Sequence, residues 1–229
     1  MNPGYNGHEW ISHFQCTTTA YNLVYTLRNK SEEEILDSFD QALNHIEVQL
    51  GKKVRFLRID GERSLGNRFD DYMLQKKIKL EVTAPDTPAQ NGGAERAGRT
   101  IVTKARSMRN AAQLPANLWP EVVKAAGYVS NRTPTKKIAW KTPFEAVRGQ
   151  LPRRSHMHIY GCKAYALKQI RERPKKAKLD PRAHIGYLVG YDSTNIFRIW
   201  TPSIAKVIRC RNIIFDDNSS YDPYDIVEL

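Results

Sequence analysis

Two carboxylates, Asp60 and Glu95, stand 35 positions apart in settings that suit metal-ion chemistry. Asp60 ends the apolar run VRFLRID at 54–60, and Glu95 follows a Pro- and Gly-rich stretch at the expected start of a helix. Carboxylates on separate rigid elements can converge on Mg²⁺, which prefers oxygen ligands and keeps several waters. Two such ions, roughly 3.5–4 Å apart, activate the attacking oxygen and stabilise the leaving oxygen in phosphoryl transfer. Spacing alone is a weak signal, so the surrounding sequence must support this interpretation.

The elements that would position these carboxylates follow an α/β order. Ser31 and Glu34 form a capping box that starts a helix, and Gly51 ends it. A mobile loop with two prolines and the Gly92-Gly93 pair is expected before the Glu95 helix. The other expected elements are strands at 10–14, 21–27, 54–60 (buried) and 78–83, a helix at 69–77, and two helices within 117–149.

The helix that begins near Glu95 carries a basic flank. At 100° per residue, Glu95, Arg99, Val102, Arg106 and Arg109 fall together. A neighbouring stripe of mostly small residues suits close packing on a sheet, and it comprises Ala94, Gly98, Ile101, Ala105, Met108 and Ala112. The alternative is a surface ion pair between Glu95 and Arg99, worth a few tenths of a kcal/mol. That pair would leave Arg106 and Arg109 without an acidic partner on the flank, so phosphate contact is favoured.

The last third of the chain has a different pattern, typical of a small β-barrel. Short strands are expected at 159–167, 185–190, 196–200 and 207–215, with glycines at the bends. Residues 151–184 hold ten Lys or Arg and two acidic residues, and the densest segment, 171–178, contains Lys175, Lys176 and Lys178. A solvated loop, a nuclear-import signal and a nucleic-acid contact remain alternatives for this segment. The sequence thus predicts one domain at 1–150 and, at 151–229, a basic linker, a small barrel and an acidic tail.

Charge is distributed unevenly along the chain, whose net charge is +12. Residues 1–50 contain 2 basic and 7 acidic residues, whereas residues 51–150 contain 20 basic and 9 acidic ones. The positive charge therefore begins where the predicted metal site begins. This asymmetry indicates a polyanionic partner, most simply nucleic acid. The alternative is a basic surface that is merely solvated.

Cysteine and hydropathy patterns indicate an intracellular protein. The three cysteines are far apart and form no disulfide framework, which suits a reducing compartment. His156, His158 and Cys162 come nearest to a zinc-site spacing, but a fourth ligand is missing, so we interpret them as strand-edge residues. No apolar run reaches membrane-spanning length and no signal peptide is visible, so we expect no membrane partner and no secretion.

From residue 7 to residue 217 the sequence resembles the integrase of Copia-type LTR retrotransposons. The matching blocks, in the order of that family, are LRIDGE at 57–62, TAPDTPAQNGGAER at 83–96, RSM at 106–108, LPANLW at 114–119, NRTPT at 131–135, KTPFE at 141–145, YGCKAY at 160–165 and GY at 190–191. Because the blocks cover nearly the whole chain, the resemblance is specific.

The resemblance implies an α/β fold: an RNase H-like integrase core, with a mixed sheet flanked by helices, followed by a small Src-homology-type β-barrel. It implies that Asp60 and Glu95 are the second and third members of a D-D-E triad that binds two Mg²⁺ or Mn²⁺ ions. Arg99 and Arg106 would position phosphates. The expected partners are the DNA ends of the element and its target DNA, with RNA as another polyanion and a second copy of the chain in an oligomer. Separately from the resemblance, the basic segment at 171–178 makes the nucleus the expected location, with the cytoplasm as the alternative.

The sequence departs from the family at the first acid of the triad. In relatives this Asp lies on a strand before the one at 10–14, and residues 1–8 contain no acid. Cys16 and Thr17 stand where relatives carry an acidic pair. The chain therefore resembles a polynucleotidyl transferase with an incomplete, N-terminally truncated catalytic core. A non-catalytic nucleic-acid-binding remnant is the main alternative; another RNase H-type nuclease fits the carboxylates but not the later blocks.

Overall fold

A computed structural model of the chain describes residues 2–59, 65–82, 88–168 and 181–224. The chain divides into two compact units, Met1–Thr103 with Val129–Pro152, and Lys104–Tyr128 with Arg153–Leu229. The break at Pro152 falls beside the junction expected at residue 150, whereas residues 104–128 group with the second unit. The division into domains at residue 150 stays a prediction. None of the described helices has the length and apolar character needed to cross a bilayer.

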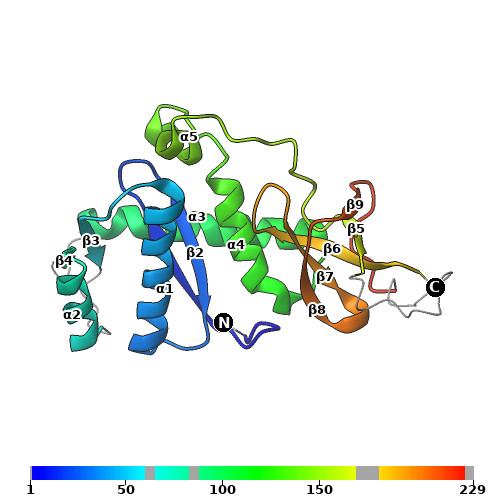
Figure 1. The fold of residues 1–229 in the computed structure, drawn as a ribbon, viewed down its shortest axis with the longest axis horizontal. Coiled ribbons are helices and arrows are strands. Elements are labelled where there is room, and N and C mark those ends of the chain that lie inside the picture. The colour runs from blue at the N-terminus through cyan, green and yellow to red at the C-terminus, as the bar shows by residue number, and fades with distance from the viewer. Residues whose placement is uncertain (1, 60–64, 83–87, 169–180, 225–229) are drawn as a thin grey trace. The chain divides into compact units, whose positions relative to one another are not determined.

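Helices and strands alternate in the first unit, as Figure 1 shows. In chain order they are β1 (Trp10–Gln15), β2 (Asn22–Leu27), α1 (Glu32–Asn44) with the π-helical turn η1 (His45–Gln49), β3 (Phe56–Ile59), α2 (Asn67–Gln75), β4 (Lys79–Val82), the first part of α3 (Pro88–Ala112), η3 (Lys136–Ile138) and α5 (Pro143–Arg148). The expected order of elements is therefore confirmed.

The strands of the first unit form two separate ribbons. β1 and β2 are antiparallel, with Trp10 opposite Leu27, and β3 and β4 are parallel, with Ile59 opposite Val82. Within the described ranges no strand joins β1 to β3. The mixed sheet implied by the resemblance is thus present as two ribbons, and each strand has one open edge.

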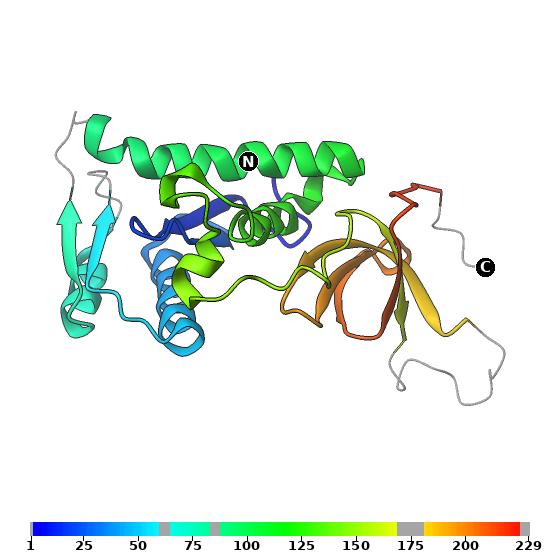
Figure 2. The same ribbon diagram turned by 90° about the horizontal axis from the view of Figure 1, so that it is seen from above.

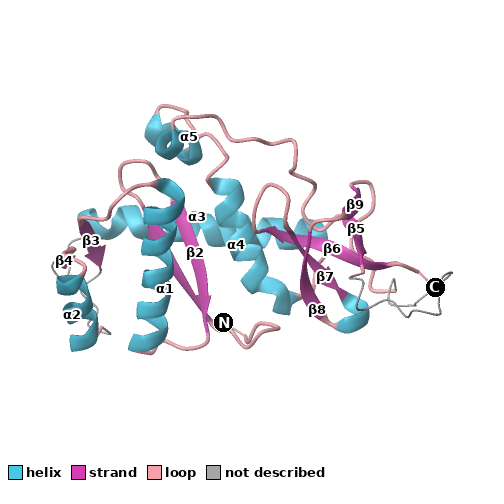
Figure 3. Ribbon diagram, viewed as in Figure 1, coloured by secondary structure: helices cyan, strands magenta, loops and turns pink. Residues whose placement is uncertain are grey.

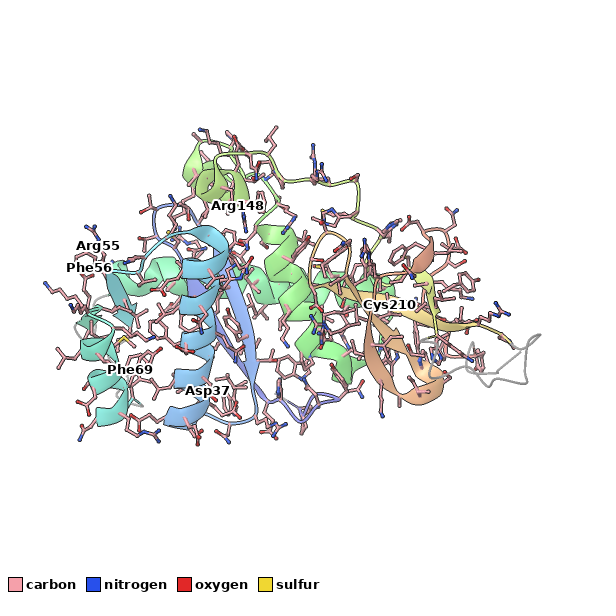
Figure 4. All side chains as sticks on the ribbon, in the orientation of Figure 1. Asp37, Arg55, Phe56, Phe69, Arg148 and Cys210 are labelled. Atoms are coloured by element: carbon pink, nitrogen blue, oxygen red, sulfur yellow. The ribbon has the colours of Figure 1, made fainter. Side chains whose placement is uncertain are left out.

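One hydrophobic cluster holds these ribbons and their helices together. Phe39 of α1 and Phe69 of α2 are buried, with ring centroids 5.8 Å apart. Figure 4 shows Phe69 between these two helices. Phe14 of β1 and Leu57 of β3 pack against the same cluster. The prediction that 54–60 is a buried strand is wrong, because β3 alternates between its two faces and leaves Phe56 58% exposed.

The capping signals in the sequence mark the ends of α1. The Oγ of Ser31 accepts a hydrogen bond from the Glu34 amide at 3.3 Å, so one unpaired N–H of the first turn is satisfied. Gly51, with φ +61°, ends the helical segment in the left-handed conformation that glycine adopts without strain. Thr142 caps α5 in the same way as Ser31 caps α1.

Helix α3 starts earlier than expected. It begins at Pro88, so Gly92 and Gly93 are helical and Glu95 lies inside the helix rather than at its start. Proline suits the first helical position because its fixed φ is helical and its missing N–H would have no partner there. The prediction that a loop with Gly92-Gly93 precedes the Glu95 helix is therefore wrong.

Asn131, directly after α4 (Trp119–Ser130), bonds to β2 within the first unit. Its Oδ1 accepts from the Asn22 amide at 2.8 Å, and its Nδ2 donates to the Asn22 carbonyl at 2.7 Å. The side chain thereby satisfies both backbone groups of a residue 109 positions away. Asn131 is buried, so this pair fixes the chain as it leaves the helix.

The second unit contains the end of α3, most of α4 and a five-stranded curled sheet (Figure 3). Its remaining elements are η2 (Ala116–Leu118), β5 (Lys163–Leu167), β6 (Ala183–Tyr191), β7 (Phe197–Thr201), η5 (Pro202–Ile204), β8 (Lys206–Cys210) and β9 (Ile213–Asp216). The strand order is β8-β7-β6-β5-β9, and all neighbours are antiparallel. The strand expected at 207–215 is two strands, because the chain turns at Arg211 and Asn212.

Candidate metal and nucleic-acid site

The parallel ribbon of the first unit directs both of its carboxyl ends to one edge. β3 ends at Ile59, so the next residue, Asp60, follows the strand directly, although Asp60 itself lies outside the described residues. β4 ends at Val82, opposite Ile59, because parallel strands share their carboxyl edge. Figure 2 shows both arrowheads directed toward the first turns of α3. The chain therefore reaches position 60 and enters the Glu95 helix on the same side of this ribbon.

Glu95 presents a carboxylate to solvent. It lies seven residues after Pro88, about two turns into α3. Its side chain is exposed, and it forms no ion pair with Arg99 or with any other described residue. The i,i+4 pair considered as an alternative is therefore not formed. An exposed carboxylate without a cationic partner can accept a metal ion or water.

The small-residue stripe of α3 is buried over part of its length. A Cβ added to Gly98 would lie 3.8 Å from Nδ1 of His13, so the helix approaches β1 at this point. Ile101 is 2% exposed, whereas Ala94, one turn earlier, is exposed. The stripe thus packs from Gly98 onward, and Glu95 lies on the helix just before that contact begins.

Two of the three arginines on the basic flank of α3 are exposed to solvent. Arg99 and Arg106 are exposed, and neither forms an ion pair with a described acidic residue. Arg109 is half-buried, and its Nη2 donates to Oδ1 of Asn110 at 2.9 Å. Burial lowers the pKa of Lys104 on the same helix. Arg99 and Arg106 can therefore contact phosphates, whereas Arg109 already has a neutral partner. Lys175, Lys176 and Lys178 lie outside the described residues.

The donor chemistry of the two predicted ligands suits a hard cation. Asp60 and Glu95 offer carboxylate oxygens, which Mg²⁺ and Mn²⁺ prefer. Among the described residues, which do not include Asp60, no three Asp, Glu, His or Cys side chains cluster as a metal site. The convergence of Asp60 and Glu95 stays a prediction.

The histidines with a loose zinc-like spacing have other partners in the second unit. The hydroxyl of Tyr128 lies 2.7 Å from Nε2 of His156, and Nδ1 of His158 lies 2.9 Å from Oδ2 of Asp217. Cys162 is buried, and burial is the main cause that raises the pKa of its thiol to about 12. These residues are therefore structural.

Two features of the segment between α4 and α5 were missed from sequence. Asn131 belongs to a block that matched the family, yet its role is to pair with the backbone of Asn22. Residues 135–141 form an exposed basic loop that displays Trp140. The signal was present, because residues 131–144 include four Lys or Arg and no acid.

Sequence comparisons relate the chain to mobile-element polyproteins. Residues 162–228 match the model of the retroviral polymerase SH3-like domain. The Retrovirus-related Pol polyprotein from transposon TNT 1-94 of Nicotiana tabacum is 33% identical over 207 residues, covering 90% of this chain. The corresponding polyprotein from transposon RE2 of Arabidopsis thaliana is 27% identical over 91% of this chain. The chain spans only 15% and 14% of the length of these two relatives.

Solved structures agree on the fold. A chain of the simian T-cell lymphotropic virus intasome, solved in complex with the PP2A regulatory subunit B56 gamma, aligns with a TM-score of 0.50 at 13% identity. The alignment covers 93% of this chain and 77% of that chain. At this identity the likeness shows the fold alone. It agrees with an RNase H-like integrase core followed by an SH3-like domain, as expected.

Proposed function

We propose, from the premise that this chain is a homologue of the Pol polyproteins of Copia-type retrotransposons, that it is part of an integrase acting on DNA. One observation carries the proposal. β3 ends directly before Asp60 at the carboxyl edge of a parallel ribbon, and α3 then presents an exposed, unpaired Glu95 near that edge. Carboxylates from a strand end and an adjoining helix are what a metal-dependent phosphoryl-transfer site requires.

Each residue of the proposed site has a defined task. Asp60 and Glu95 would hold Mg²⁺ or Mn²⁺, and bound metal would supply activation of an attacking oxygen and charge stabilisation at phosphorus. Arg99 and Arg106 would fix DNA phosphates on the flank of α3 that also carries Glu95. The family chemistry is trimming of a DNA 3′ end followed by joining of that end to a target strand, without a covalent protein intermediate.

The open edges between the two ribbons suggest how the site would be completed. β1 and β3 each pair on one side only within the described ranges, and Phe14 and Leu57 contribute to one shared core. A further strand seated between β1 and β3 would unite the ribbons and could bring the remaining acid to the carboxyl edge. In this proposal, the chain by itself has little or no strand-transfer activity.

A second candidate function is DNA binding without catalysis. It is favoured by exposed Arg99 and Arg106, which lack acidic partners among the described residues, and by the departure of Cys16 and Thr17 from the acidic pair of relatives. Both candidates predict DNA binding. They differ in whether restoring the upstream strand restores chemistry.

A strand-transfer assay separates the two candidates. Fluorescent duplex ends would be incubated with the chain alone, and with the chain fused to the strand that precedes the matching region in the TNT 1-94 polyprotein, in Mg²⁺ or Mn²⁺. We expect joined products only from the fusion, and loss of them in Asp60→Asn and Glu95→Gln. Efficient joining by the unmodified chain would contradict the incomplete site. DNA binding without joining by a well-folded fusion would favour the binding remnant.

Location and assembly are further parts of the proposal. The basic segment at 171–178 would direct the protein to the nucleus, and fusion of this segment to a fluorescent reporter tests that role. We also propose that the integrase works as an oligomer, with DNA rather than RNA as its main partner. Sedimentation of the chain with and without duplex DNA measures its oligomeric state.

A further inference from the structure

A closed basic loop, residues 135–141, projects between α4 and α5; we term it the Trp140 loop. Two backbone hydrogen bonds close it: the Trp140 amide donates to the Thr135 carbonyl at 3.0 Å, and the Thr135 amide donates to the Lys141 carbonyl at 3.1 Å. The 3-10 turn η3 (Lys136–Ile138) fills the space between these ends. The loop therefore has a defined backbone rather than being a slack connection.

Trp140 is displayed at a conformational cost. Its indole is 69% exposed, and both it and Ala139 adopt left-handed backbone conformations, with φ of 61° and 54°. Non-glycine residues in this region are disfavoured by roughly 1 kcal/mol or more each. A large apolar ring held in water by a disfavoured backbone contributes little to the core. Two adjacent residues in this disfavoured backbone region favour a role for the loop in contacting a ligand.

The surroundings of the indole are cationic. Lys136, Lys137 and Lys141 are all exposed, and no acidic residue occurs between positions 131 and 144. Nζ of Lys137 donates to Oε1 of Gln15 at 3.2 Å, which fixes this side of the loop to the end of β1. The loop thus offers one aromatic face with positive charges on either side of it in sequence.

The base of the loop is rigid and also basic. The guanidinium carbons of Arg132 and Arg148 lie 5.1 Å and 5.4 Å from the centroid of the Phe144 ring. The Arg132 contact joins the segment that enters the loop to the helix that follows it, whereas the Arg148 contact lies within α5. Arg148 is the last residue of α5, and Figure 4 labels it at that helix.

We propose that the Trp140 loop binds unpaired nucleotides, with Trp140 stacked on a base and Lys136 and Lys141 on the neighbouring phosphates. Exposed aromatic rings among cations are the recurring means of holding single strands, because each base has a π face and each linkage a negative charge. Within a duplex these faces are covered by neighbouring base pairs, so the ring can stack only on the two terminal pairs. The proposal deepens the proposed function and rests on a polynucleotide being the partner of this chain.

Fluorescence anisotropy with a labelled 12-nucleotide single strand and a blunt duplex of the same sequence tests the inference in the full chain. Trp140→Ala should weaken single-strand binding about tenfold and leave duplex binding within about twofold. Trp140→Phe retains a ring and should lose much less. Tyr224→Ala removes an aromatic residue that is even more exposed, at 85%, and far along the sequence, so it should change neither affinity.

The lysines provide a second measurement with a different readout. Lys136→Ala with Lys141→Ala should lower the slope of log K against log salt on single strands by about 1.4, at about 0.7 for each lost phosphate contact. Circular dichroism melting of every variant establishes that the fold is retained. Trp140→Phe keeps an aromatic ring, and the lysine double change keeps Trp140. If one of these variants misfolds, the other still tests whether the loop binds single strands.

The outcomes are distinguishable from those of the proposed function. Equal loss on single strand and duplex after Trp140→Ala, or no loss on either, overturns the stacking role while DNA binding by the chain stands. Loss of binding to anionic phospholipid vesicles, with oligonucleotide binding unchanged, assigns the loop to a membrane surface and overturns it as well. If the unmodified chain binds neither oligonucleotide at low salt, both the single-strand site and the proposal that the chain binds nucleic acid are contradicted. If the completed core joins DNA and Trp140→Ala does not change that joining, the proposed function is retained and the role given to the Trp140 loop is not.

Discussion

Glu121 and Arg198 form a two-point ion pair inside the second unit. Nε of Arg198 lies 2.5 Å from one carboxylate oxygen of Glu121, and Nη2 lies 2.7 Å from the other. The Glu121 side chain is 1% exposed, and the Arg198 side chain is 23% exposed. Because Glu121 is on α4 and Arg198 is on β7, the pair ties this helix to the curled sheet.

Removing one partner of this pair should destabilise the protein strongly. Glu121→Ala leaves a mostly buried guanidinium, for which Asp192 at 3.6 Å is only partial compensation, so we expect a loss of about 3 kcal/mol. The double change Glu121→Leu with Arg198→Leu should cost less than the sum of the single changes. Urea unfolding followed by circular dichroism measures this. Arg209→Ala, at an exposed pair with Asp192, is the control and should cost under about 1 kcal/mol; an equal loss there would contradict the role of burial.

Gly161 should tolerate alanine far less well than Gly149. Both have positive φ, +82° and +71°, but an added Cβ at Gly161 would lie 2.3 Å from Cβ of Ala112, whereas nothing lies within 4 Å at Gly149. We expect Gly149→Ala to cost about 1 kcal/mol from backbone strain alone and Gly161→Ala about 3 kcal/mol or more. Thermal melting compares the two. The double change Gly161→Ala with Ala112→Gly should recover part of the loss; no recovery would mean that strain, not the clash, dominates.

Stability should fall as the pH drops below about 6.5. Burial lowers the pKa of His13, against the smaller opposing effect of its hydrogen bond to Asn22, and burial also lowers the pKa of His45. The unfolded state therefore binds protons that the folded state does not, so the contribution is complete above the unfolded pKa and is lost as pH falls from there through the lower folded pKa. Urea titrations between pH 7.5 and 5.5 measure the trend. His13→Gln should flatten it, and a wild-type stability that rises over this interval would oppose the assignment.

DNA binding should depend steeply on salt and on the flank of α3. Arg99→Ala with Arg106→Ala should lower the slope of log K against log salt on a duplex by roughly two, at about 0.9 per phosphate contact. Replacing Lys175, Lys176 and Lys178 with alanine tests the other basic segment independently. Anisotropy titrations at several salt concentrations give the slopes. If neither set changes the slope, the positive charge is solvated surface.

The order of elements followed from local signals, and the errors came from places where tertiary context overrides them. Ser31, Glu34 and Gly51 defined α1 because caps act through the neighbouring backbone. The start of α3 was misplaced because Gly92 and Gly93 are poor helix formers by propensity, yet they lie within a helix of 25 residues. The break at Arg211 escaped notice because it lacks both Gly and Pro.

The parts of the candidate site that lie among the described residues agree with the sequence, whereas the meeting of Asp60 with Glu95 stays a prediction. Asp60 at a strand end and Glu95 on the following helix were visible as motifs, and the exposure of Arg99 and Arg106 agrees with the wheel. The assignment of β1 and β3 to different ribbons could not be predicted from sequence, because strand pairing joins residues that are distant along the chain. Nor could it show that Asn131 satisfies the backbone of Asn22, because that bond spans 109 positions.

The open edges of β1 and β3 have a consequence for handling the protein. A strand edge with free amides and carbonyls is a template for pairing with another molecule, and natural proteins usually cover or charge such edges. Phe56 of β3 and Val82 of β4 are apolar, and each is 58% exposed. Their side chains would add an apolar contact wherever two molecules pair through these strands. Aggregation through intermolecular β-sheet pairing is therefore expected when this chain is concentrated alone. A strand that pairs with the open edge should reduce that aggregation.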